Sequence, residues 1–342
     1  MRKFLFAVLL LLGLYFLSTR FTEVEQVAET LQRGDKKWIV LAIGLHFVWL
    51  VNIAATFRSC YRLLELDETI ERLLLLSLGA NFVNVIAPAA GVSGLAVFIS
   101  DSRARGKPTG RVTSAAALSI AYDYLAFIVV LGLGLTVLIR RDRLGAAEIT
   151  ASLVMVAIAS VFATLLWTGM RSGDKLGEVL AWMARPVNRL LRPIRKRDYL
   201  SEDNAREFAR EVADGLAIAR KAPRGAILLP AALALSKQAL LISILFMVFM
   251  AFGQAFSVGT LVAGYAIGYL FVIVSPTPSG IGFVEGAMTL ALTTLRVPLA
   301  AATVITLAFR GITVWLTLLY GMVAMRWIGK QPSAPGPAQP SS

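Results

Sequence analysis

Long apolar blocks separated by charged connectors dominate the chain. The blocks are residues 4–17, 38–57, 73–100, 114–139, 149–167, 226–252, 258–295 and 299–327. A helix needs about 20 mostly apolar residues to cross a bilayer, and in lipid its backbone groups must bond within the segment. The pattern therefore predicts an all-α fold, a polytopic integral membrane bundle over residues 1–330 with about six full spans. The Pro/Ser-rich tail, residues 331–342, is predicted to be disordered.

Proline and glycine interrupt two of the apolar blocks. The first break contains Pro88, Gly91 and Gly94, and the second contains Pro276, Pro278, Gly280 and Gly282. Proline removes a backbone donor, and glycine allows a tight turn. Both flanks of the first block, residues 58–72 and 103–111, are basic, which places them on the same side of the membrane. We therefore predict two re-entrant half-helix hairpins, with a single kinked span as the alternative at each break.

The two breaks belong to a repeated order of features. Asp123 follows Pro88 by 35 residues, and Arg310 follows Pro276 by 34. In the predicted topology the first hairpin enters from the cytoplasm and the second from outside, which is an inverted repeat of the kind found in transporters. Broken helices survive in a membrane where protein or water satisfies their backbone. We expect a cavity between them, with half-helix N-termini directed at an anion.

Several charged and polar side chains fall inside apolar blocks. Asp123 and Arg310 lie about nine and ten residues into their spans, near the bilayer centre, where a charge is costly. We expect them to pair, either as a structural pin or as a switch that opens to bind a lipid phosphate or move a proton. Lys237 is a second candidate for anion contact. Glu285 either caps the second half-helix or couples a proton or cation, and Asn84 either satisfies broken backbone or lines the cavity.

Charge and composition narrow the function further. The net charge is +13, from 34 Lys and Arg against 21 Asp and Glu, and most of the excess lies between apolar blocks. Such residues orient a membrane protein and contact anionic lipids, so we expect no nucleic-acid partner. We predict a bacterial cytoplasmic (inner) membrane protein with both termini and the basic loop 170–224 in the cytoplasm. With one Cys and one His, we expect no disulfide, metal site, cofactor or catalytic triad.

The second break carries a family resemblance. Residues 275–285, SPTPSGIGFVE, resemble the membrane region of lysylphosphatidylglycerol synthases, also called flippase-like proteins. The family pattern is P-x-P-G-G-x-G-x-x-E followed by an Arg, matched by Arg310. Its earlier N-x-x-x-P-x-x-x-G stretch is matched by Asn84, Pro88 and the Gly91/Gly94 pair, and Asp123 fits an acidic residue in the next span. The resemblance covers residues 4–328, and Ser279 departs from it where the family often has glycine.

The resemblance implies a function in lipid movement. It implies translocation of an anionic phospholipid or a polyprenyl-linked lipid between leaflets, with membrane lipids as partners. Aminoacyl transfer is not expected, because only fifteen residues follow Trp327. Two alternatives stay open. One is a membrane-embedded enzyme that modifies a lipid or glycan carrier through Asp123 and Glu285. The other is an accessory scaffold that holds a partner synthase through the loop 170–224.

Overall fold

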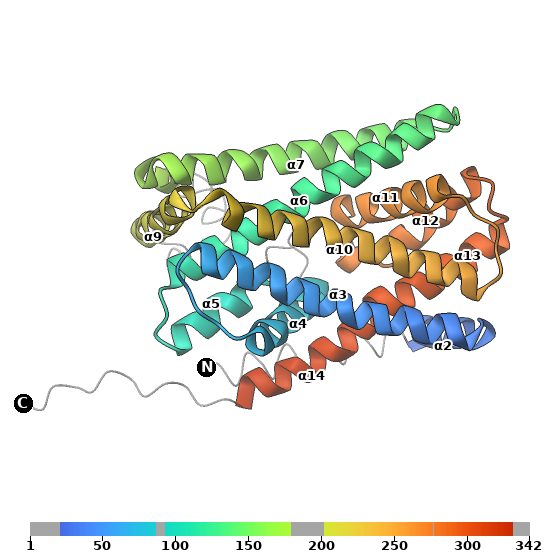
Figure 1. The fold of residues 1–342 in the computed structure, drawn as a ribbon, viewed down its shortest axis with the longest axis horizontal. Helices are drawn as coiled ribbons and strands as arrows, with labels where there is room; N and C mark the ends of the chain where they lie inside the picture. Colours follow the sequence, from blue (N-terminus) through green and yellow to red (C-terminus); the bar gives the residue numbers. More distant parts are fainter. Residues whose placement is uncertain (1–20, 87–92, 179–201, 276, 331–342) are drawn as a thin grey trace, which may run out of the picture.

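The computed structural model describes residues 21–86, 93–178, 202–275 and 277–330, which form helices joined by short turns (Figure 1). No strand occurs in these residues. The helices are α2 (Phe21–Arg33), α3 (Lys36–Leu63), α4 (Ile70–Ile86), α5 (Leu95–Ala104), α6 (Thr109–Arg140), α7 (Ala146–Arg171), α9 (Glu202–Lys221), α10 (Arg224–Ala251), α11 (Val258–Val274), the 3-10 turn η1 (Pro278–Gly280), α12 (Phe283–Thr294), α13 (Leu299–Arg310), the π-helical turn η2 (Gly311–Trp315) and α14 (Leu316–Lys330).

Five stretches in the described part of the chain are long and apolar enough to cross a membrane. They are α3, α6, α7, α10 and the run from Leu299 to Trp327 through α13, η2 and α14. These are the predicted spans at 38–57, 114–139, 149–167, 226–252 and 299–327. The all-α polytopic bundle is therefore confirmed. The predicted first span, residues 4–17, and the tail 331–342 lie outside the described residues.

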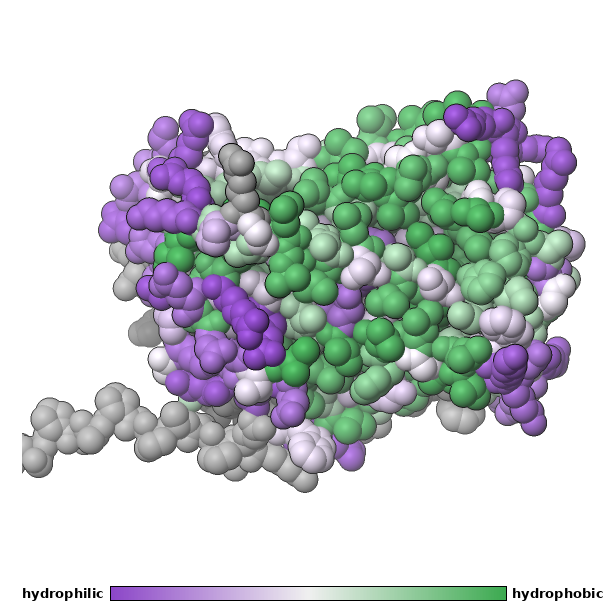
Figure 2. Space-filling view, viewed as in Figure 1, coloured by the Kyte–Doolittle hydropathy of each residue, from purple (hydrophilic) through white to green (hydrophobic). Residues whose placement is uncertain are grey.

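The surface of the bundle is arranged for a bilayer. Apolar residues cover the middle of the molecule, and hydrophilic residues gather at its two ends (Figure 2). Large apolar side chains face outward along the spans, including Val40 and Leu153, each 66% exposed. Continuous apolar surface of this extent is not stable in water. The chain is a multi-pass membrane protein.

Two short helix hairpins lie at the interrupted blocks. The first is α4 with α5, and the second is α11 with α12. Figure 1 shows α5 toward one end of the molecule, together with α9, and α12 toward the other. The helices α5 and α12 have 10 and 12 residues, so they reach about 15 and 18 Å, roughly half of a hydrocarbon core of about 30 Å. That each hairpin enters and leaves the membrane on the same side stays a prediction.

Small residues let helices approach one another closely, both within a hairpin and between a hairpin and a long helix. A Cβ on Gly321 of α14 would lie 2.7 Å from the carbonyl oxygen of Leu78 on α4. One on Gly268 of α11 would lie 2.9 Å from the sulfur of Met288 on α12. In lipid the hydrophobic effect does not drive helices together, so van der Waals packing at small residues supplies much of the attraction.

Two helices outside the candidate spans pack against the bundle. The first is α9. Its apolar side chains Val212 and Leu216 are buried, and the Ser114 hydroxyl of α6 donates to the Val212 carbonyl at 2.9 Å. The second is α2, whose Val27 is buried beside Gly311 of η2. Their apolar faces are therefore covered by other helices.

Candidate functional site

A cavity of about 370 Å³ lies between the two hairpins. All the long spans except α7 contribute to its wall, as do both hairpins. Its polar and charged lining residues are Ser77, Asn81, Asn84, Asp123, Lys237, Ser275, Thr277, Ser279, Arg310, Thr313 and Thr317. The structure thus brings together, around one space, residues separated by more than 200 positions in sequence. A cavity between the two breaks was the central expectation from the sequence.

Arg310 holds the tip of the second hairpin. Its Nε donates to Glu285 Oε1 at 2.8 Å, and its Nη2 donates to the Ser279 carbonyl at 2.6 Å. The other carboxylate oxygen of Glu285 accepts from the Gly282 backbone N–H at 2.7 Å, which caps α12. Glu285 therefore acts as the predicted cap and also as the ion-pair partner of Arg310. Only 5% of the Arg310 side chain is exposed. The Arg310 guanidinium and the Glu285 carboxylate are therefore held in fixed positions.

The backbone at this tip needs residues that tolerate positive φ. Gly280 has φ of 73° and Gly282 has φ of 82°, values that suit glycine. Ser279, where the family often has glycine, has φ of 50°, in a region that costs residues with a Cβ free energy. Gly280 and Gly282 shape the turn. Pro278 opens η1 beside them, and Pro276 lies outside the described residues.

Asn84 caps the start of α5 in the first hairpin, as Glu285 caps the start of α12 in the second. Its Oδ1 accepts from the Ser93 hydroxyl at 2.8 Å and from the Gly94 N–H at 2.6 Å, at the start of α5. A Cβ on Gly94 would lie 2.8 Å from both the Ala80 carbonyl oxygen and Asn84 Nδ2. At the start of each short helix, a side-chain oxygen therefore accepts a hydrogen bond from a backbone N–H. Pro88 and Gly91 lie outside the described residues.

Asp123 pairs with Lys237, and the expected pair of Asp123 with Arg310 is wrong. The Lys237 ammonium of α10 contacts Asp123 Oδ2 of α6, and Arg310 is bound to Glu285 instead. The partners differ because α6 packs against α10, while the Arg310 fork reaches the tip of the second hairpin. Two ion pairs are therefore found where one had been expected: Asp123 and Lys237 both line the cavity, and Arg310, which also lines it, pairs with Glu285 behind the wall.

The remaining lining is aromatic and hydroxylic. Tyr265 and Tyr269 of α11 line the cavity, and the Tyr265 hydroxyl donates to Gln238 Oε1 beside Lys237. Trp49 and Ser77 also line it, and their buried Nε1 and Oγ atoms have no hydrogen-bond partner in the part of the chain that is described. The sequence did not identify Tyr265, Tyr269, Gln238, Trp49 or Ser77 as site residues. Two tyrosines spaced by four in a strongly apolar run were a usable signal.

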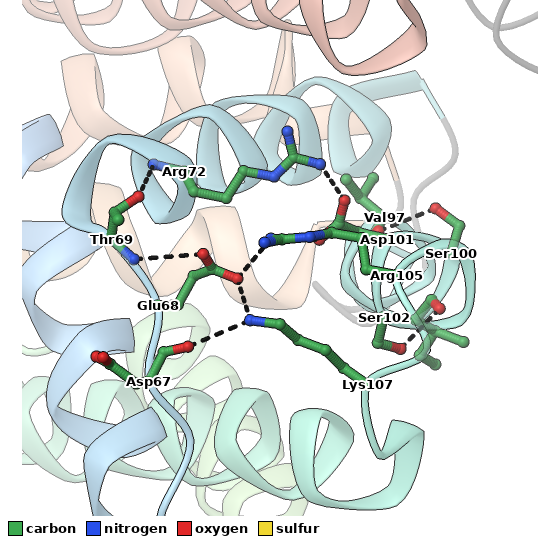
Figure 3. Close-up of polar contacts among 11 residues, drawn as sticks. Asp67, Glu68, Thr69, Arg72, Val97, Ser100, Asp101, Ser102, Arg105 and Lys107 are labelled. Atoms are coloured by element: carbon green, nitrogen blue, oxygen red, sulfur yellow. Dashed lines mark hydrogen bonds and ion pairs between the residues drawn. The ribbon is translucent and has the colours of Figure 1, made fainter. Parts of the chain in front are cut away.

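A cluster of charged residues ties together the base of the first hairpin (Figure 3). This base cluster consists of Glu68, Arg72, Asp101, Arg105 and Lys107. Arg72 of α4 bonds Asp101 of α5, and Glu68, before α4, accepts from Arg105 at 2.6 Å and from Lys107. Burial alone would raise the pKa of Glu68, but the hydrogen bond and charge of Lys107, together with Arg105, lower it overall. The base cluster thus joins the start of α4 to the end of α5.

The described residues offer no metal centre. They contain no group of three or more His, Cys, Asp and Glu side chains placed to hold an ion. His46 is buried, its Nε2 lies 3.1 Å from the Thr317 hydroxyl, and its ring stacks on Trp49 with centroids 5.2 Å apart. This environment is that of a packed histidine.

Comparison with known proteins agrees with the geometry. No curated protein matches the chain. The sequence model of the family described as "Lysylphosphatidylglycerol synthase TM region" matches residues 4–321. The matched range includes both hairpins, the base cluster and the two ion pairs of the cavity. The chain therefore belongs to the family of lysylphosphatidylglycerol synthase transmembrane regions.

Proposed function

We propose that the protein moves an anionic phospholipid or a polyprenyl-linked lipid between the leaflets of the bacterial cytoplasmic membrane. Membership of the family relates the chain to lipid modification or flipping. The observation that favours flipping is the cavity itself, which presents Lys237 and Arg310 inside an otherwise apolar bundle. The headgroup would occupy this cavity while the acyl or prenyl chains stay in lipid.

The charges support a passage for a headgroup. An ionised side chain within a membrane protein is expensive, and it typically marks the path of a substrate or ion. Replacing a purely structural buried pair by apolar residues is often neutral or stabilising, so two such pairs around one cavity favour a functional role. A volume of about 370 Å³ falls in the range of roughly 300–1,000 Å³ typical of small-ligand sites. It suits a headgroup and excludes the lipid tails.

Unsatisfied polar atoms in the wall support the same proposal. Trp49 Nε1 and Ser77 Oγ are buried and lack partners among the described side chains and backbone. Buried polar groups normally have a hydrogen-bond partner, in the protein or from water or a ligand. A small rotation of either side chain toward the cavity would let a phosphate or hydroxyl oxygen of a headgroup accept its hydrogen bond.

Leaflet exchange in vesicles tests the proposal. The purified chain is reconstituted in liposomes that contain fluorescent phosphatidylglycerol, and exchange is read by quenching the outer leaflet with an impermeant reductant. We expect exchange by the wild type and at least about tenfold slower exchange by Lys237→Gln, which loses a charge-assisted contact of about 1.5–3 kcal/mol with the headgroup. Arg310→Gln should also slow exchange, because it loses the ion pair that positions the second hairpin at the cavity. Arg210→Gln is the matched control, because Arg210 forms an exposed pair with Asp174.

The outcomes separate the proposal from its rivals. Wild-type exchange no faster than in empty liposomes would refute flipping of this lipid. Retention of full exchange by both cavity variants would refute the assigned route. A new lipid product in the mass spectrum of the recovered lipids would instead support the membrane-embedded enzyme. Exchange by the isolated chain would rule out a role that needs a partner synthase.

A further inference from the structure

The two ion pairs of the cavity are restrained very differently. Both carboxylate oxygens of Glu285 are occupied, one by Arg310 and one by the Gly282 N–H, and Arg310 also holds the Ser279 carbonyl. Asp123 is held by Lys237 alone, through Oδ2, and its buried Oδ1 has no hydrogen-bond partner among the described residues. The Asp123 side chain is also the more exposed, at 29% against 21% for Glu285. Asp123 is thus the carboxylate that a ligand can displace most easily.

Displacing Asp123 creates a charge problem. The two pairs together carry no net charge, because Lys237 and Arg310 balance Asp123 and Glu285. An anionic headgroup that takes Lys237 leaves the Asp123 carboxylate without its cation, with Oδ1 already buried and Oδ2 facing the bound anion. A buried ionised group that has lost its partner is strongly unfavourable, and such groups neutralise themselves by binding a proton.

We propose that the site binds an anionic headgroup and a proton together, with the headgroup on Lys237 and the proton on Asp123. This inference rests on the proposed function. The proton comes from the aqueous phase and adds to an Asp123 carboxylate oxygen, and no bond of the lipid breaks. One negative charge and one positive charge enter together, so the summed charge of the two ion pairs and their ligands stays at zero.

In the described part of the chain, the neighbours that interact electrostatically with Asp123 provide no substitute for the lost cation. Besides Lys237 on α10, they are Tyr124 on its own helix α6, Tyr265 and Tyr269 on α11, and Cys60 on α3. The tyrosines and the thiol are uncharged when protonated and can add only negative charge. Arg310 lines the same cavity but is engaged by Glu285 and the Ser279 carbonyl. A proton is the replacement that the site leaves available.

Calorimetry measures the coupled proton directly. Dihexanoylphosphatidylglycerol is titrated into the purified full chain in detergent at pH 7, in two buffers with different heats of ionisation. The difference in binding heat gives the number of protons taken up. We expect about one proton per headgroup, and an affinity that falls about tenfold for each unit of rising pH.

Three variants assign the proton to Asp123. Asp123→Asn should bind the headgroup without proton uptake and without the dependence on pH, and Lys237→Gln should lose binding. Asp174→Asn makes the same chemical change in an exposed pair and should behave as the wild type does. If Asp123→Asn does not fold, the wild-type stoichiometry still tests whether a proton binds together with the headgroup.

The failures of the two proposals are distinguishable. Wild-type binding and leaflet exchange without proton uptake would overturn the coupling and leave flipping intact. The same proton uptake in Asp123→Asn as in the wild type would overturn the assignment to Asp123. Absence of both binding and leaflet exchange in the wild type would overturn the proposed function and this inference with it.

Discussion

Asp101→Asn is the sharpest test of how the base cluster holds the first hairpin. The substitution keeps the size and one oxygen of the side chain but removes its charge. Asp101 bonds Arg72 directly, and its second oxygen lies 3.9 Å from Arg105. The Arg72 and Asp101 side chains are only 9% and 4% exposed. The Arg72 guanidinium group would therefore lose a buried counter-charge without gaining access to water.

The expected size of the effect follows from that burial. Removing one partner of a buried pair costs about 3–5 kcal/mol, because the remaining charge stays desolvated. The same substitution in the pair of Asp174 with Arg210, whose side chains are 74% and 67% exposed, should cost about 0–1 kcal/mol. Replacing both members by apolar residues, as Arg72→Met with Asp101→Leu, should restore much of the loss, since no charge then remains unpaired.

The free energy of unfolding, measured by titrating the detergent-solubilised protein with sodium dodecyl sulfate, checks these values. The change is read from the loss of helical circular dichroism. If Asp101→Asn and Asp174→Asn shift the transition equally, the buried pair does not stabilise the hairpin as argued. A double variant whose loss equals the sum of two severe single losses would contradict the proposed origin in an uncompensated charge.

Three further predictions concern stability. Ser279→Gly should stabilise the protein by up to about 1–2 kcal/mol, because φ of 50° at this position penalises a residue with a Cβ; thermal unfolding in detergent measures it. Gly321→Ala should destabilise by about 1–3 kcal/mol through overpacking, whereas Gly44→Ala, with nothing within 4 Å of the added carbon, should not; the same scan compares them. The lowered pKa of Glu68 means that its charge stabilises the fold at neutral pH, and that this contribution disappears as pH falls below the ordinary value of 4.5. The difference in melting temperature between wild type and Glu68→Gln should therefore shrink on acidification, and a constant difference would contradict the assignment.

Much of the fold could be predicted from the sequence, because membrane spans depend on length and hydropathy within one segment. The same local logic located both breaks, since proline and glycine act on the backbone where they occur. It also identified Asp123, Lys237 and Arg310, because a charge in an apolar run is conspicuous without knowledge of its partner. All three line the cavity.

The partners of these charges could not be predicted. Which cation meets Asp123 depends on how α6, α10 and α13 are rotated and packed, and the sequence spacing that suggested Arg310 contains no such information. The base cluster was missed for a related reason. Arg72, Arg105 and Lys107 were interpreted only as markers of membrane orientation, yet each forms an ion pair with a carboxylate on a neighbouring segment.

Ser279 illustrates how a departure from a family pattern can leave the site's chemistry intact. The pattern favours glycine there because φ is positive, which is a demand on the backbone. Arg310 uses the carbonyl oxygen of the same residue at 2.6 Å, and every residue type supplies a carbonyl. The serine therefore makes the turn less favourable in energy while keeping the contact that positions Arg310. The arginine is the group whose replacement would remove the ion pair, and the two substitutions should be distinguishable as a change in stability and a loss of lipid exchange.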